Sequence, residues 1–212
     1  MKNGDAIRNA LVENTISLIG NGGFEKATTK AIVSLGIDDP SIKLNEVYIY
    51  RAFGSKELLY AEAFSVLDTE LFTRVRNAVA QSFYIEGTFR DRMQSLFDKM
   101  WEFLIGNECR CRCYVRYYYS AYFREQTMRN HRKHLSTQKE FFATIFKEES
   151  DTVTLIHNTF MTMMDFAIRV FNGELENDEE NTYHIFNLLY YSLTPYFDPE
   201  VVATGNPRRR SN

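Results

Sequence analysis

The feature that most constrains the fold is the spacing of the apolar side chains, which follows a helical period along almost the whole chain. The clearest example is Met93, Leu96, Phe97, Met100 and Leu104, which recur at intervals of three and four residues. Such spacing lines one face of an α-helix, whereas a half-buried strand alternates at every second residue. The sequence contains no sustained alternation of the second kind. It therefore predicts an all-α fold.

Capping residues divide this pattern into helices. The N-terminal part is predicted to hold three short helices and a long one, over residues 6–20, 28–35, 45–52 and 55–79. Gly22-Gly23 and Gly36 are suited to end the first two, because glycine readily adopts the left-handed conformation of a helix C-terminus. Thr28 is a predicted N-cap. This arrangement of short helices and glycine turns is typical of a helix-turn-helix unit.

The C-terminal part shows five longer amphipathic stripes. They fall at residues 93–104, 114–122, 135–146, 156–170 and 186–197. Asn177, with Glu180 three residues on, is the predicted N-cap of the last helix. Residues 201–212 are expected to be a disordered tail, which contains Arg208-Arg209-Arg210.

Composition limits the class of protein. Of 212 residues, 44% are hydrophobic and 15% aromatic, which supplies ring surface for a core and for a pocket or interface as well. No apolar run reaches the ~18 residues that a membrane helix needs, and the N-terminus has no apolar segment of the signal-peptide kind. We therefore expect a cytoplasmic protein with no membrane partner.

Charge alone does not predict a nucleic-acid partner. The net charge is −3, and residues 1–60 contain seven Lys or Arg against seven Asp or Glu. A basic domain would have indicated DNA or RNA. Any such interaction has to be argued here from local geometry.

Two stretches near the N-terminus resemble the tetracycline-repressor (TetR) family of transcription regulators. They are Gly22-Gly23-Phe24 followed by residues 28–32, and residues 45–59, which contain Ile49-Tyr50-x-x-Phe53-x-Ser55-Lys56-Glu57-x-Leu59. The resemblance covers about residues 5–65, and the remainder is similar in length, helical content and aromatic richness. It implies a homodimeric repressor with a helix-turn-helix DNA-binding domain over 1–60 and a multi-helix ligand-binding and dimerisation domain over 61–200.

The resemblance also implies roles for individual residues. Four would hold DNA phosphates: Thr28, Thr29, Tyr50 and Lys56. Six are placed to reach bases or backbone: Lys30, Asn45, Glu46, Val47, Tyr48 and Arg51. Ile49 and Phe53 would instead be core residues that fix the recognition helix to its neighbours. Arg51 is the best guanine reader by its chemistry, although its place beside Tyr50 suits a phosphate equally.

One segment departs from the family pattern. Between Gly36 and Asn45 the family usually has a turn of one or two residues, whereas this chain has about seven more. Either the loop bulges away from DNA or it lengthens the supporting helix by a turn. Asp38 and Asp39 would repel phosphate if they faced it.

A tyrosine stripe in the second half suggests a pocket. Tyr114, Tyr117, Tyr118 and Tyr122 share a helix face, and a buried tyrosine needs a partner for its hydroxyl. A partly polar cavity explains four such residues better than a dry core. The other expected ligand contacts are Phe97, Met100, Trp101, Leu104, Phe142, Phe146, Phe160, Met163 and Met164. Methionine and aromatic walls suit a small apolar or aromatic effector.

The predicted helix-turn-helix also bears on assembly. Such a unit reads two half-sites about one turn of DNA apart, or a multiple of it, so it needs a dimer. The helices near residues 156–171 and 182–195 are expected to pack against their twofold mates as a four-helix bundle. The expected partners are a second copy of the chain, a palindromic double-stranded DNA operator and a small-molecule effector. No cofactor is expected.

Other interpretations have less support. On a helix Cys111 points away from Cys109 and Cys113, so the three cannot bind one metal ion there. His131 and His134 have metal-compatible spacing, but they lie in a basic segment that is expected to be solvated. The sequence contains no catalytic motif, so no enzyme is expected. The alternative is a TetR-fold interaction module that has lost specific operator binding, which the lengthened turn and the neutral N-terminal domain favour.

Overall fold

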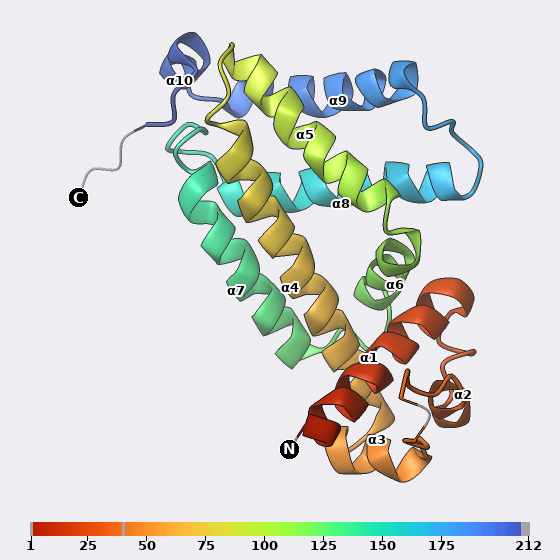
Figure 1. The fold of residues 1–212 in the computed structure, drawn as a ribbon. Coiled ribbons are helices and arrows are strands. Elements are labelled where there is room, and N and C mark those ends of the chain that lie inside the picture. The colour runs from red at the N-terminus through yellow and green to blue at the C-terminus, as the bar shows by residue number, and fades with distance from the viewer. Residues whose placement is uncertain (1, 40, 209–212) are drawn as a thin grey trace. The chain divides into compact units, whose positions relative to one another are not determined.

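The computed structural model describes residues 2–39 and 41–208, and these residues form ten α-helices and one 3₁₀ turn with no strand (Figure 1). In chain order they are α1 (Lys2–Gly22), α2 (Thr29–Ser34), α3 (Glu46–Phe53), α4 (Lys56–Ser82), α5 (Phe89–Ile105), α6 (Glu108–Tyr118), α7 (Glu125–Phe142), α8 (Thr152–Phe171), α9 (Glu179–Leu193), η1 (Thr194–Tyr196) and α10 (Pro199–Thr204). The all-α prediction is confirmed. None of these helices is both long and apolar enough to cross a bilayer.

The helices group into two compact units. The first holds the chain up to Thr69 together with Asn107–His131, and the second holds Glu70–Gly106 together with the chain from Arg132 onward. These units are defined by packing, and the functional boundary expected after residue 60 stays a prediction. Helix α4 continues in the first unit to Thr69, and α6 belongs to that unit as well.

Local capping sets the ends of the first short helices. Thr28 Oγ1 accepts a hydrogen bond from the backbone N–H of Ala31 at 3.1 Å, which confirms it as the N-cap of α2. Gly36 follows α2 with a φ of 75°, a left-handed conformation that glycine adopts without steric strain. Asn14 Nδ2 donates to the carbonyls of Ile32 and Gly36 at 3.0 and 2.9 Å. These bonds tie α1 to the end of α2.

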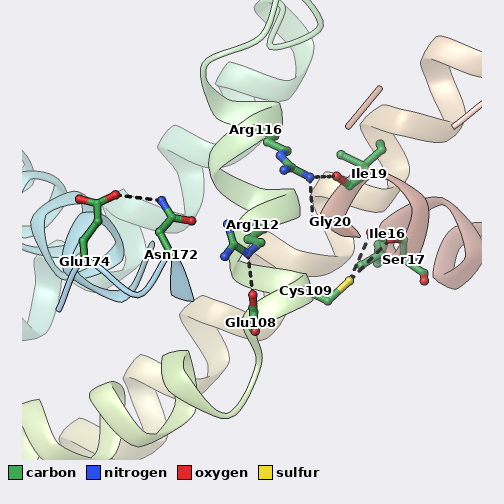
Figure 2. Close-up of polar contacts among 10 residues, drawn as sticks. All are labelled: Ile16, Ser17, Ile19, Gly20, Glu108, Cys109, Arg112, Arg116, Asn172 and Glu174. Carbon is green, nitrogen blue, oxygen red and sulfur yellow. Dashed lines mark hydrogen bonds and ion pairs between the residues drawn. The ribbon is translucent and has the colours of Figure 1, made fainter. Parts of the chain in front are cut away.

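Helix α6 packs on the C-terminal half of α1 within the first unit (Figure 2). Arg116 Nη1 donates to the carbonyls of Ile19 and Gly20 at 2.5 and 2.7 Å. A Cβ at Gly20 would lie 2.2 Å from the carbonyl oxygen of Cys109, so only glycine permits this approach. The two helices are therefore held by close backbone contact and by one arginine.

The cysteines of α6 are ordinary thiols in this packing. Burial raises the pKa of Cys111 and of Cys113 to about 12, and it raises the pKa of Cys109 by a smaller amount. A thiol with a raised pKa is a poor metal ligand, because the thiolate is the form that binds. The described residues contain no cluster of three or more metal-ligating side chains.

The second unit caps α9 differently from the prediction. Asp178 is the N-cap and accepts a hydrogen bond from Asn181 N at 2.7 Å. Asn177 Oδ1 instead accepts from the indole N–H of Trp101 at 2.9 Å. The amide is needed there because a buried indole N–H requires an acceptor.

The expected disordered tail is wrong for residues 201–208. Helix α10 buries Val201 completely. Arg208 Nη2 donates to the carbonyls of Ala143 and Phe146 at 2.8 and 2.6 Å, so charge-assisted bonds hold the segment in place. Arg209 and Arg210 lie outside the described residues.

Candidate functional site

Helix α3 presents one face to solvent and buries the other. Ile49 and Phe53 are buried, which confirms their expected place in the core. Val47 is 59% exposed and Tyr50 54% exposed. Asn45 caps the helix, and its Oδ1 accepts from Val47 N at 3.0 Å. Two apolar anchors thus fix a short helix whose outer side chains remain available.

None of the ten residues predicted to meet DNA is buried. They come from the start of α2, from α3 and from the start of α4: Thr28, Thr29, Lys30, Asn45, Glu46, Val47, Tyr48, Tyr50, Arg51 and Lys56. All belong to the first unit. Their hydroxyls, one amide, two lysines and one arginine can donate hydrogen bonds to phosphates and base edges. The one carboxylate, that of Glu46, is repelled by phosphates.

One pair within this set is already engaged. The hydroxyl of Thr29 donates to Glu46 Oε2, which links α2 to the first turn of α3. The Thr29 hydroxyl hydrogen is therefore unavailable to a phosphate unless Glu46 releases it. A carboxylate at the first position of a helix also interacts favourably with the helix dipole.

The structure excludes one of the two alternatives for the lengthened segment 37–44, namely that it extends the supporting helix. Helix α2 has six residues and ends at Ser34, so the extra residues do not lengthen it. The described part of the segment is instead an exposed loop, in which Asp39 Oδ1 accepts from the N–H and the hydroxyl of Ser41 at 2.9 and 2.7 Å. These bonds lower the pKa of Asp39, which therefore stays negatively charged. Pro40 lies outside the described residues.

The second unit contains a cavity of about 70 Å³. Six of its lining residues were predicted as ligand contacts: Phe97, Met100, Phe142, Phe146, Phe160 and Met163. Nine were not: Val75, Met93, Leu96, Ile156, Thr159, Phe186, Leu189, Tyr190 and Leu193. Seven of those nine stand on apolar stripes that the sequence shows, so helical spacing could have indicated them. No charged side chain lines this cavity, and only Thr159 and Tyr190 bring polar side-chain atoms.

The tyrosine stripe does not reach this cavity. Tyr114, Tyr117, Tyr118 and Tyr122 belong to the first unit, whereas every residue that lines the cavity belongs to the second. The predicted contacts Trp101, Leu104 and Met164 are buried but do not line the cavity either. Tyr117 and Tyr122 instead line a more polar pocket of about 910 Å³ within the first unit, so a tyrosine-lined ligand site stays a prediction.

The hydroxyls of the two buried tyrosines of the stripe are satisfied by the protein. Tyr117 donates to the carbonyl of Tyr122 at 2.9 Å. Tyr114 donates to Asp68 Oδ1 at 3.0 Å. Burial first, and then the negative charge of Asp68, raise the pKa of Tyr114 well above its ordinary value, so this hydroxyl stays protonated.

Asp68 also contacts His131, which was expected from the sequence to lie in a solvated segment. His131 is 4% exposed, and its Nδ1 lies 2.9 Å from Asp68 Oδ1. The expectation of a solvated His131 is wrong, because this buried carboxylate requires a partner and the α7 histidine provides one. The basic segment therefore turns one side chain inward.

Comparison with known proteins places this architecture. No protein-family model and no curated protein sequence matches the chain. Among solved structures, it is similar to a TetR-family transcription regulator from Marinobacter aquaeolei VT8, with 15% identity, a TM-score of 0.68, and coverage of 93% of this chain and 98% of the other. It is also similar to a TetR-like transcriptional regulator from Rhodococcus sp. RHA1, with 15% identity, a TM-score of 0.59, and coverage of 89% and 96%.

A further neighbour is a transcriptional regulator from the same Rhodococcus strain, with 16% identity, a TM-score of 0.61, and coverage of 89% and 97%. The chain thus has the all-helical fold of these solved structures. More particularly, it is the TetR fold, as the resemblance of residues 22–32 and 45–59 implied.

Proposed function

We propose that the chain is a transcription regulator that binds a double-stranded DNA operator through α2, α3 and the start of α4. The observation that carries the proposal is the construction of α3. Ile49 and Phe53 anchor it, while its exposed face combines an amide, a carboxylate, two tyrosines and an arginine. A helix fixed on one side and rich in donors on the other suits the major groove.

The residue roles follow the chemistry of each side chain. Tyr50 and Lys56 are proposed phosphate contacts, as is Thr28, whose hydroxyl hydrogen remains free while its oxygen caps α2. Thr29 would join them after Glu46 releases it. Six further residues are proposed to reach bases or backbone: Lys30, Asn45, Glu46, Val47, Tyr48 and Arg51.

We further propose that the regulator is a homodimer and a repressor. Helix α9 exposes more than half of Tyr183, Leu188 and Tyr191, and such apolar side chains favour an interface. Packing of α8 and α9 against a second copy would cover them. Two copies would then present two α3 helices to the half-sites of a palindromic operator.

The proposed effector is small, uncharged and apolar or aromatic. Because no charged side chain lines the cavity of the second unit, a charged ligand would lose its hydration without compensation. Met93, Met100 and Met163 have flexible side chains that adapt to ligand shape. For release from DNA, the effector has to bind the non-operator conformation more tightly, since only differential affinity shifts an equilibrium.

Fluorescence anisotropy with a duplex from upstream of the chain's own gene tests the proposal. We expect tighter binding to this duplex than to random DNA, with a logarithmic affinity that falls linearly with the logarithm of salt concentration. Lys56→Ala should weaken both duplexes alike and flatten the salt slope by about one unit per subunit. Equal affinity for both duplexes, together with no motif from a genome-wide selection, would leave the alternative function.

That alternative is a TetR-fold interaction module without operator specificity. Two observations favour it: the exposed acidic loop around Asp38 and Asp39, and the carboxylate of Glu46 on the proposed DNA face. Glu46 places negative charge on the proposed DNA face, and Asp38 and Asp39 would repel phosphate as well if their loop faced it. An operator-specific signal in the anisotropy experiment decides between the two functions.

A further inference from the structure

Glu46 is an unusual side chain for a surface that meets DNA. It is exposed at the first position of α3, and no Lys, Arg or His forms a salt bridge with it among the described residues. Its Oε2 accepts from Thr29, while the structure gives Oε1 no partner there. One oxygen is thus fixed by α2, and the other remains free to accept a hydrogen bond from outside.

A carboxylate restricts what it can bind, because it accepts hydrogen bonds and donates none. Phosphate oxygens repel it, so the donors left on a DNA duplex are the amino groups of the bases. In the major groove, cytosine presents its N4 amino group without an acceptor beside it. Adenine presents N6 next to the acceptor N7, and guanine presents only the acceptors O6 and N7. The carboxylate therefore favours cytosine and strongly disfavours guanine.

The neighbouring side chain has a matching preference. Val47 is 59% exposed although it is apolar. The thymine methyl is the apolar group that the major groove offers, and apolar side chains are among its usual contacts. Glu46 and Val47 are both exposed in the first turn of α3, so a base close to the one that Glu46 meets is within reach of Val47.

We propose that Glu46 is a specificity-determining residue that selects cytosine and rejects guanine in each half-site, with Val47 selecting a nearby thymine. The inference rests on the proposed operator binding and adds a base identity to it. Bound in this way, the negative charge of Glu46 discriminates between sequences at the expense of non-specific affinity. The neutral charge balance of residues 1–60 agrees with such a trade.

Selection from a random duplex pool tests the proposal, with wild type, Glu46→Gln and Glu46→Ala in parallel. The wild type should return half-sites with an invariant cytosine. Changing that cytosine·guanine pair to guanine·cytosine should weaken wild-type binding at least about tenfold and Glu46→Ala binding less than about threefold. Glu46→Gln, which keeps an acceptor for Thr29 and adds a donor, should shift the preference toward adenine or guanine. Glu25→Ala removes the same charge outside α3 and should leave the base preference unchanged.

Deoxyuridine in place of the nearby thymine removes only the methyl group. It should weaken wild type several-fold and leave Val47→Ala unaffected. The inference fails if wild type and Glu46→Ala select the same bases with the same penalties, and operator binding itself then still stands. If wild type selects no motif at all, operator binding and this inference fail together. Far-UV circular dichroism of each variant checks that α3 remains folded, because a purely structural role would change stability and not base preference.

Discussion

The two compact units bury different chemistry. In the first, Asp68, His131 and Tyr114 share one buried network, and Arg116 donates into the end of α1. In the second, the cavity wall is methionine, aromatic and aliphatic, with hydroxyls at Thr159 and Tyr190. A buried polar network requires defined geometry, whereas apolar walls tolerate rearrangement. The difference suggests that the first unit, which carries the proposed DNA contacts, is rigid, and that the second, which carries the proposed effector cavity, is adaptable.

The largest expected effect is at Asp68. Asp68→Ala removes the buried carboxylate that His131 and Tyr114 share, so we expect the free energy of unfolding to fall by ~3–5 kcal/mol. Urea unfolding followed by circular dichroism measures it. Asp165→Ala, an exposed change in α8, is the control and should cost less than ~0.5 kcal/mol. Similar losses in the two variants would remove the polar network as a distinguishing feature of the first unit.

A somewhat smaller effect is expected at the contact of α1 with α6. Gly20→Ala places a Cβ 2.2 Å from the carbonyl oxygen of Cys109, which forces the helices apart. Overpacking of this kind costs ~1–3 kcal/mol, and here we expect the upper end because the clash is with backbone. Gly4→Ala in the same helix meets nothing within 4 Å and should instead stabilise by up to ~1 kcal/mol. Thermal unfolding of the pair gives the comparison, and equal Tm values would contradict the close approach.

Local and long-range features differ in how far the sequence reveals them. Thr28 and Gly36 were predictable because a cap depends on residues within one turn of the chain. The pairing of Asp68 with His131 joins residues 63 apart, and no spacing rule encodes it. The tyrosine stripe is visible in the sequence, but the protein groups that accept hydrogen bonds from Tyr114 and Tyr117 are not. Periodicity shows which residues share a helix face and does not show what covers that face.

The candidate sites show the same limit. The exposed face of α3 followed from Asn45, Ile49 and Phe53 alone. The cavity depends on the relative placement of α4, α5, α7, α8 and α9, so its walls could be predicted from the sequence only in part. Asp178 and not Asn177 is the N-cap of α9, because the Asn177 amide accepts a hydrogen bond from the Trp101 indole. Here too a tertiary contact overrides a local sequence signal.

A moderate effect is expected from the arginine that joins α6 to α1. Arg116→Met keeps the length of the side chain but removes two bonds to helix carbonyls, so we expect a loss of ~2 kcal/mol. Arg110→Met removes a more exposed ion pair with Glu13 and should cost less than ~1 kcal/mol. Denaturant midpoints of the two variants measure the difference. If Arg110→Met costs as much as Arg116→Met, charge and not carbonyl capping holds α6 to α1.

The smallest expected effect is in the cavity wall, and it tests whether the second unit is as adaptable as its lining suggests. Thr159 Oγ1 donates to the carbonyl of Leu155 at 2.8 Å, and Thr159→Val replaces that hydroxyl with a methyl group. The Leu155 carbonyl lies within α8, where the helical N–H remains its partner, so the free energy of unfolding should change by less than ~1 kcal/mol.

Xenon suits a cavity of about 70 Å³ and is an uncharged probe of it. Removing one of two hydroxyls should raise xenon affinity about two- to threefold, measured by ¹²⁹Xe chemical-shift titration. Thr162→Val makes the same change on α8 away from the cavity and should leave xenon binding unaltered. A loss of stability like that of Asp68→Ala, or no xenon binding by either protein, would show that the second unit is as tightly specified as the first.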